Sequence, residues 1–251
     1  MKFIRIICLL GIFGVLLTPH SVQAVPNIGD GYKQFDQLYL DATASSLTGL
    51  SATQMFTLGW RKEQQAFYLQ VMNAWSDTLG TSSLYQYTSQ GITLSGGIRY
   101  YLPGDAWYVF ASEGILVCGP YAGSFDPRVG LVGSNEWNFA RGKVIDLYSD
   151  CTYVNLYQDT YFTLRIRDGK ILSQHGNSRI WAYAIGNLQA DSAGSNGLSN
   201  RIEAGIGLGY RTYEAPFGLS ATLDFRLGDS FRGAIAHRHY SNPMFVISGG
   251  F

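Results

Sequence analysis

Residues 201–211 read RIEAGIGLGYR and determine the interpretation of the whole chain. The odd-numbered positions hold Arg201, Glu203 and Arg211 with three glycines between them, whereas the even-numbered positions hold isoleucine, alanine, leucine and tyrosine. Side chains of a β-strand alternate between its two faces, so this period of two predicts a strand with one charged or small face and one apolar face. The segment therefore belongs to a sheet that separates a polar from an apolar environment.

The same alternation recurs along the chain. Residues 219–227 read LSATLDFRL, and residues 161–167 read YFTLRIR before Asp168-Gly169, a dipeptide typical of two-residue hairpin turns. Residues 170–174 would begin the return strand. Further strand candidates are 37–43, 53–62, 65–75, 92–102, 106–118, 138–149, 179–191, 231–240 and 244–251. No linker or long repeat interrupts them, so we expect one all-β domain over residues 25–251.

The composition excludes several classes of protein. Charged residues make up 14% of the 251 residues, where a soluble domain has about 25%. Without Lys2 and Arg5, which lie in a leader, the chain has 16 basic and 18 acidic residues and a net charge of about −2. A disordered or nucleic-acid-binding chain needs more charge or a basic excess, so we expect no nucleic-acid partner.

Residues 1–24 have the pattern of a secretory signal peptide. Basic Lys2 and Arg5 precede an apolar run over 6–17. Small residues at the key positions of 22–24 predict cleavage after Ala24. The run is too short for a membrane helix, which needs about 20 apolar residues. Export would remove Cys8 with the leader and leave Cys118 and Cys151, whose pairing the sequence leaves open.

Three features indicate that the apolar face is the outer one. The mature chain has only four lysines, fewer than a soluble all-β surface uses. Aromatic residues flank two turns, as the interfacial girdles of membrane barrels do: Tyr100, Tyr101, Trp107 and Tyr108 at the first, and Tyr210, Tyr213 and Phe217 at the second. The chain also ends in a short alternating segment that closes on Phe251.

That ending resembles the C-terminal signal of bacterial outer-membrane β-barrel proteins, in which the barrel assembly machinery reads a terminal aromatic residue. The resemblance implies that Phe251 is recognised during assembly and that the exterior meets outer-membrane lipid. At roughly 19 residues per strand and connection, the chain predicts a single antiparallel transmembrane β-barrel of about 12 strands, with 10 to 14 acceptable.

The polar face would then line the lumen. The residues expected there are Arg165, Arg167, Arg201, Glu203, Arg211, Asp224 and Arg226. Because both signs of charge occur together, salt-bridged filling of the lumen and a ligand path are both open interpretations. Inward faces of the segments at 201–211 and 220–226 meet only if paired residue numbers sum to an odd value near 430, which places Gly205 and Gly207 beside Asp224 and Arg226.

A second group of residues suggests chemistry. His239 and Ser241 are two positions apart and share a strand face, where an imidazole can activate a hydroxyl if a carboxylate orients the ring. The run His239-Tyr240-Ser241-Asn242 resembles the active-site motif of outer-membrane lipid A 3-O-deacylases, which implies catalytic roles for His239 and Ser241 and an oxyanion role for Asn242. That family places a glutamate on a following strand, and no acidic residue follows Ser241 here.

A third resemblance covers residues 177–232. The stretches Trp181-Ala182-Tyr183, Gly186-Asn187, 200–205 and Tyr210-Arg211 are similar to the C-terminal barrel of the phage-adsorption protein A family and related exopolysaccharide-secretion porins. It implies an outer-membrane barrel that passes or displays a surface glycan and that phage can use as a receptor.

These observations lead to three functional hypotheses. The first is a conduit or receptor for surface glycan or another small polar solute, the second is an ester hydrolase using Ser241 and His239, and the third is a structural or adhesive barrel. No metal-ligand spacing, phosphate loop or nucleophile elbow occurs, so we expect no cofactor.

Overall fold

The computed structural model of the chain describes residues 31–45, 49–76, 91–119, 121–192, 200–214, 217–231 and 239–250. The predicted signal peptide, its cleavage site at Ala24 and the terminal Phe251 lie outside these residues. Within these described residues, the regular structure consists of twelve strands and one 3-10 turn. They are β1 (Lys33–Ser45), β2 (Gly49–Lys62), β3 (Gln65–Ser76), β4 (Gly91–Tyr101), β5 (Trp107–Cys118), β6 (Arg128–Asn138), η1 (Ala140–Gly142), β7 (Lys143–Val154), β8 (Asp159–His175), β9 (Ser178–Asp191), β10 (Arg201–Glu214), β11 (Phe217–Ser230) and β12 (His239–Gly250).

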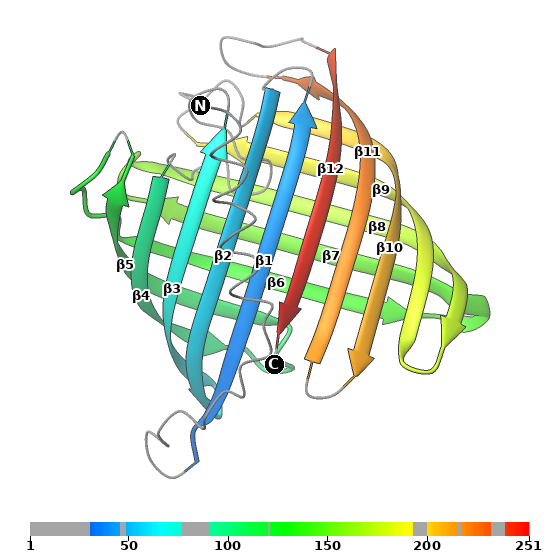
Figure 1. The fold of residues 1–251 in the computed structure, drawn as a ribbon, viewed down its shortest axis with the longest axis horizontal. Coiled ribbons are helices and arrows are strands. Elements are labelled where there is room, and N and C mark those ends of the chain that lie inside the picture. The colour runs from blue at the N-terminus through cyan, green and yellow to red at the C-terminus, as the bar shows by residue number, and fades with distance from the viewer. Residues whose placement is uncertain are drawn as a thin grey trace, which may run out of the picture. The chain divides into compact units, whose positions relative to one another are not determined.

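The strands form one closed antiparallel barrel (Figure 1). Each strand pairs with its neighbours in sequence, and β1 closes the ring by pairing with β12 from Gln37–Gly250 to Thr43–Met244. Closure satisfies the backbone hydrogen-bonding groups of both outermost strands, so the sheet has no free edge. The prediction of a single antiparallel barrel of about 12 strands is confirmed.

The barrel is polar inside and apolar outside. On β10 and β11 the outward residues Ile206 and Leu227 are 69% and 61% exposed, whereas inward Glu203 and Arg226 are each 1% exposed. A soluble barrel would bury the first pair and expose the second. The described part of the chain contains no helix with the length and apolarity to cross a membrane. The alternation is that of a barrel whose strands span a bilayer.

The longest connections lie at one end of the barrel. Residues 77–90, 119–127, 192–200 and 231–238 join strands at that end, which we call the long-connection end. The opposite, short-turn end has the connections 63–64, 102–106, 139–142, 176–177 and 215–216. Outer-membrane barrels show the same asymmetry, with longer loops outside the cell and short turns in the periplasm.

The predicted hairpin turn at Asp168-Gly169 is wrong. Both residues pair on two sides, Asp168 with Ile145 and Ala184, and Gly169 with Val144 and Tyr183. The strand β8 therefore continues to His175, and the turn falls at Gly176-Asn177, where Gly176 has a positive φ of 54°. Neighbouring ladders on both sides override the local turn preference of the dipeptide.

Two other boundaries also differ from the sequence-based prediction. The segment 138–149 is not one strand, because β6 ends at Asn138 and the chain turns at Arg141 and Gly142, both with positive φ, before β7. The strand β6 itself was not predicted. The predicted strand 231–240 is also wrong at its first residue, since Phe231 lies outside the strands, and β12 begins at His239.

The two cysteines of the barrel do not form a disulfide bond. Cys118 ends β5, and Cys151 lies in β7 opposite Leu131 of β6. Both are free and exposed. The pairing that the sequence left open is therefore not made in this fold.

Candidate functional site

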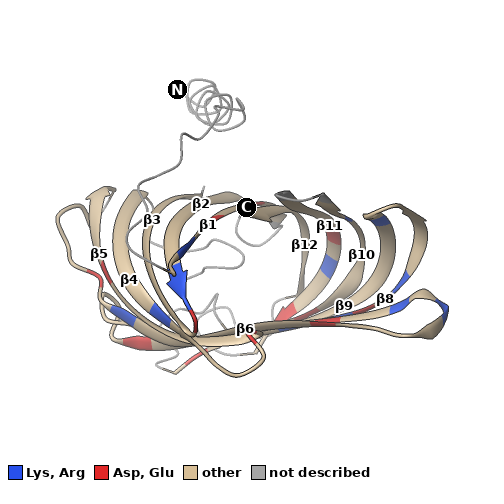
Figure 2. Ribbon diagram, turned by 90° about the horizontal axis from the view of Figure 1, so that it is seen from below, with Lys and Arg blue, Asp and Glu red and all other residues tan. Residues whose placement is uncertain are grey.

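All seven residues predicted to line the lumen occupy inward positions of the barrel. Arg165 and Arg167 lie on β8, Arg201, Glu203 and Arg211 on β10, and Asp224 and Arg226 on β11. Figure 2 shows acidic and basic positions close together on β11. The predicted register is also confirmed, because Gly205 pairs with Arg226 and Gly207 pairs with Asp224.

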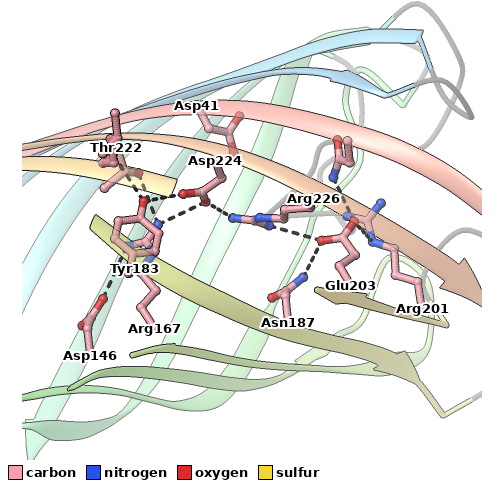
Figure 3. A network of polar contacts seen from close by, with 12 residues as sticks. Asp41, Asp146, Arg167, Tyr183, Asn187, Arg201, Glu203, Thr222, Asp224 and Arg226 are labelled. Atoms are coloured by element: carbon pink, nitrogen blue, oxygen red, sulfur yellow. Dashed lines mark hydrogen bonds and ion pairs between the residues drawn. The ribbon is translucent and has the colours of Figure 1, made fainter. Parts of the chain in front are cut away.

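Glu203 is the centre of a buried polar network (Figure 3). Its Oε2 accepts hydrogen bonds from Asn187 at 2.9 Å and from Arg226 at 3.2 Å. Its Oε1 accepts hydrogen bonds from Tyr240 at 3.0 Å and from Asn242 at 2.9 Å, and Arg201 Nε lies 3.5 Å from the same oxygen. One carboxylate thus joins β9, β10, β11 and β12 across the lumen wall.

Asp224 is the second carboxylate of the network. It forms an ion pair with Arg226 and accepts a hydrogen bond from the Tyr183 hydroxyl. Arg167 reaches the same carboxylate at 3.4 Å and bridges to Asp146 on β7 at 3.4 Å. The network, which we define as Asp146, Arg167, Tyr183, Asn187, Arg201, Glu203, Asp224, Arg226, Tyr240 and Asn242, therefore extends from β7 to β12. Paired charges of both signs fill this side of the lumen, as one of the two sequence-based interpretations expects.

Glycines on β10 make room for the network. A Cβ atom on Gly207 would lie 2.5 Å from the Tyr183 ring and 2.7 Å from Asp224 Oδ1. A Cβ atom on Gly209 would lie 2.0 Å from Trp181 Nε1. Because real Cβ atoms do not approach so closely, only glycine lets these side chains lie across the backbone of β10.

Two of the predicted arginines lie outside the network. Arg211 forms an ion pair with Glu136 of β6, which also binds Arg179, near the short-turn end. The guanidinium carbon of Arg165 lies 5.1 Å from the centre of the Tyr148 ring, a cation–π distance. The five arginines that the sequence grouped as lumen charges therefore lie in three different environments: Arg167, Arg201 and Arg226 in the network, Arg211 beside Glu136, and Arg165 beside the Tyr148 ring.

A cavity of about 590 Å³ lies in the lumen and is lined by residues of β1–β7 and β10–β12. Asp126 and Arg128 line it near the long-connection end, and Arg211 and Tyr213 line it near the short-turn end. Its wall combines aromatic rings with hydrogen-bonding groups: Tyr39, Tyr68, Tyr108, Tyr148, Phe110, Gln37, Gln70, Ser95, Ser112, Asp150, Thr152 and Arg99. The lining therefore extends between the two ends of the barrel and presents both ring faces and polar groups.

The sequence-based prediction assigned two tyrosines to the wrong face of the barrel wall. Tyr101 and Tyr108 were expected in an interfacial girdle, but both point inward, with ring centres 5.4 Å apart, and Tyr101 is buried. Tyr100 and Tyr210 do lie on the exterior, 44% and 39% exposed. Arg99 was not singled out, although it continues the inward alternation Gly97, Arg99, Tyr101 on β4. That alternation was the available signal.

The residues of the hydrolase hypothesis lie on opposite faces of β12. His239 and Ser241 share the outward parity of Phe245, and the His239 side chain is 87% exposed. Asn242 is 1% exposed and points into the lumen, where it binds Glu203. Glu203 and Asp224 also face the lumen, so neither can orient the His239 ring. Asp229, which sequence reasoning missed, pairs directly with His239, and its Oδ2 lies 3.9 Å from His239 Nδ1.

Among the described residues, no group of three or more histidine, cysteine, aspartate or glutamate side chains is placed to hold a metal ion.

No family model matches this chain, and a search of curated proteins gives no significant match. Solved structures similar to it include the β-domain of the Bordetella autotransporter BrkA, at 12% identity, covering 88% of this chain and 98% of that one, with a TM-score of 0.47. A bacterial polysaccharide outer membrane secretin has 9% identity, coverage of 87% and 97%, and a TM-score of 0.43. KdgM porin in complex with disordered oligogalacturonate has 10% identity, coverage of 84% and 97%, and a TM-score of 0.40. These values carry no argument for function, and the fold rests on the strand pairing itself.

Proposed function

We propose that this protein is an outer-membrane barrel whose lumen binds or passes a small, hydroxyl-rich solute such as a glycan. An apolar exterior supports the membrane location, and the position of the longest connections supports an orientation with the long-connection end outside the cell. Export through the predicted signal peptide and recognition of Phe251 by the assembly machinery belong to the same proposal.

One observation carries the proposed role, namely the cavity whose lining extends between the two ends of the barrel. Tyrosine rings offer flat apolar faces to the carbon skeleton of a sugar ring. Glutamine, serine, threonine and arginine side chains offer hydrogen bonds to its hydroxyl groups. A purely structural barrel would have no need of this lining, whereas a solute path requires it.

Replacing Ser95 with tryptophan tests the proposal. Ser95 lines the cavity and lies opposite Gly114, so an indole at this position has space on the wall and extends into the cavity. We expect Ser95→Trp to lower single-channel conductance in planar bilayers and to slow the swelling of proteoliposomes in galactose. Conductance and swelling rates of purified, folded protein provide the measurement.

Leu94→Trp is the matched control. Leu94 is the adjacent residue on β4, points outward and is 44% exposed, so the same side chain would enter lipid instead of the cavity. The control should behave like the wild type in both assays. A wild-type barrel that conducts neither ions nor galactose would refute the conduit and favour a structural or adhesive barrel.

The hydrolase remains the second candidate because Asp229 lies beside His239. At 3.9 Å the two groups form an ion pair at most and no hydrogen bond, and the Asn242 amide is on the lumen side of β12. A triad whose carboxylate does not orient the imidazole loses about 10⁴-fold in turnover. We therefore expect no deacylation of lipid A by the wild type, as measured by mass spectrometry of lipid A from expressing cells. Acyl release that disappears in Ser241→Ala would reverse this ranking.

A further inference from the structure

Arg99 of β4 lies in an aromatic cage in the wall of the cavity. Its guanidinium carbon is 4.4 Å from the centre of the Tyr68 ring, 4.9 Å from that of Tyr108 and 5.6 Å from that of Phe35. Nη1 donates a hydrogen bond to Gln37 Oε1 at 3.0 Å. The side chain is held by rings on several strands, so its position is defined before any ligand arrives.

Arg99 and Arg165 differ from the other buried arginines in their electrostatic partners, and of these two only Arg99 lines the cavity. Six arginines of the inner wall form ion pairs with carboxylates among the described residues: Arg128, Arg167, Arg179, Arg201, Arg211 and Arg226. Among the described residues, no carboxylate forms an ion pair with Arg99. Its charge is balanced only by ring faces and neutral polar groups, which compensate burial less completely than an anion would.

The same arginine has an unused donor. Arg99 is 6% exposed, and its Nε has no hydrogen-bond partner among the described residues. Four other arginines, Arg165, Arg167, Arg179 and Arg226, also have an Nε without a hydrogen-bond partner among the described residues, but none of them lines the cavity. A buried donor without a partner is costly, and that of Arg99 is the one among these five that a molecule in the cavity can complete. The cavity that Arg99 lines is the space from which that molecule would approach.

The charged residues that line the cavity are Arg99, Arg128, Arg211, Asp126 and Asp150. Two of these three arginines form ion pairs, Arg128 with Asp126 and Arg211 with Glu136. Among the arginines of the lining, Arg99 is therefore the one whose ion pair with a carboxylate is left to a ligand.

We propose that Arg99, held by Tyr68 and Tyr108, is a subsite for the carboxylate of an acidic sugar. The guanidinium would bind the carboxylate through charge-assisted hydrogen bonds, while nearby ring faces and the polar groups of Gln70, Ser95 and Ser112 contact the rest of the sugar. This subsite rests on the proposed function and narrows its substrate class from hydroxyl-rich solutes to those with a negative charge.

The test compares D-glucuronate with D-glucose, which differ only at the carboxylate-bearing carbon. Calorimetry on the folded barrel in detergent measures binding without requiring conduction, and block of the ion current in planar bilayers measures it during conduction. The wild type should bind glucuronate about tenfold more tightly than glucose, as one charge-assisted contact predicts. Arg99→Gln should remove this preference, and Arg99→Lys should retain part of it because the charge remains but the planar fork is lost.

The double variant Arg61→Gln with Asp105→Asn is the control. It removes an ion pair whose residues do not line the cavity, without changing the net charge, and it should keep the preference for glucuronate. Heat-modifiable gel migration checks that each variant is folded. If Arg99→Gln does not fold, the glucuronate preference of Arg99→Lys is compared with that of the wild type instead. Equal binding of the two sugars by the wild type, or an unchanged preference in a folded Arg99 variant without the charge, would refute the subsite. Preference in calorimetry without any permeation would refute the conduit and leave the subsite intact.

Discussion

Glu203→Ala should lower the free energy of unfolding of the barrel by about 3–5 kcal/mol, the usual loss when one partner of a buried ion pair is removed. Glu203 is 1% exposed and receives contacts from Asn187, Arg201, Arg226, Tyr240 and Asn242. Without it, Arg201 loses its ion pair and Arg226 keeps only Asp224. Urea titration of the folded barrel in lipid vesicles measures the loss.

Asp105→Ala supplies the comparison. Asp105 also forms an ion pair, with Arg61 at 2.6 Å, but it lies in a turn and its side chain is 62% exposed. Exposed pairs contribute at most about 1 kcal/mol, so this variant should unfold nearly as the wild type does. Equal losses for Glu203→Ala and Asp105→Ala would mean that the network of β7–β12 does not stabilise the barrel.

Ile206→Arg should destabilise the inserted barrel by about 2–4 kcal/mol, the cost of an arginine at the bilayer midplane on the lipid face. Ile206 points outward from the middle of β10 and is 69% exposed. In a soluble barrel the same change would place a charge in water at almost no cost. The measurement is again unfolding by urea in vesicles, together with the yield of inserted protein.

Ile180→Arg makes the same exchange near the end of a strand. Ile180 is the third residue of β9, close to the short-turn end, and is 46% exposed. An arginine there reaches the headgroup region, and the expected cost falls to about 0–1 kcal/mol. If both variants unfold alike, or if the wild type is recovered as a soluble monomer, the membrane-spanning interpretation is wrong.

The period of two was sufficient to predict which residues face the lumen. Since side chains of a strand alternate strictly, the charged parity of 201–211 and 219–227 had to lie on one side, and the paired residue numbers had to have an odd sum. The observed pairing of Arg201 with Ser230 satisfies both conditions. Periodicity over many residues constrains register more strongly than any local signal does.

Local turn signals were less reliable because they ignore neighbouring strands. Asp168-Gly169 has the composition of a turn, yet ladders to β7 and β9 keep it extended. The break at Arg141 and Gly142 has a different cause, since a single glycine is also compatible with a strand and does not by itself reveal a turn with positive φ. The first error arises where the partners of a segment, and not its own residues, decide its conformation.

The sequence was sufficient to predict which residues belong to the candidate site, but not which of them contact one another. Parity placed Glu203, Asp224 and Arg226 in the lumen, and their mixed charge indicated ion pairs. Arg99 contacts aromatic rings where the other arginines contact a carboxylate. This follows from the presence of Tyr68 and Tyr108 on the two flanking strands and from the distance between Arg99 and the acidic residues of the barrel, and neither can be read from β4 alone. The approach of Asp229 to His239 likewise required the register of β11 against β12.

The pairing of β1 with β12 constrains the order in which the barrel can assemble. Thr43 pairs with Met244, so residues near opposite ends of the sequence must meet before the ring is complete. Contacts of such long range form slowly, and until they form, β1 and every intermediate last strand present unpaired backbone groups to other chains. A nascent or shortened polypeptide that lacks β12 therefore has two unpaired sheet edges, which are templates for aggregation. Both edges are lost only when β12 pairs with β1 and β11.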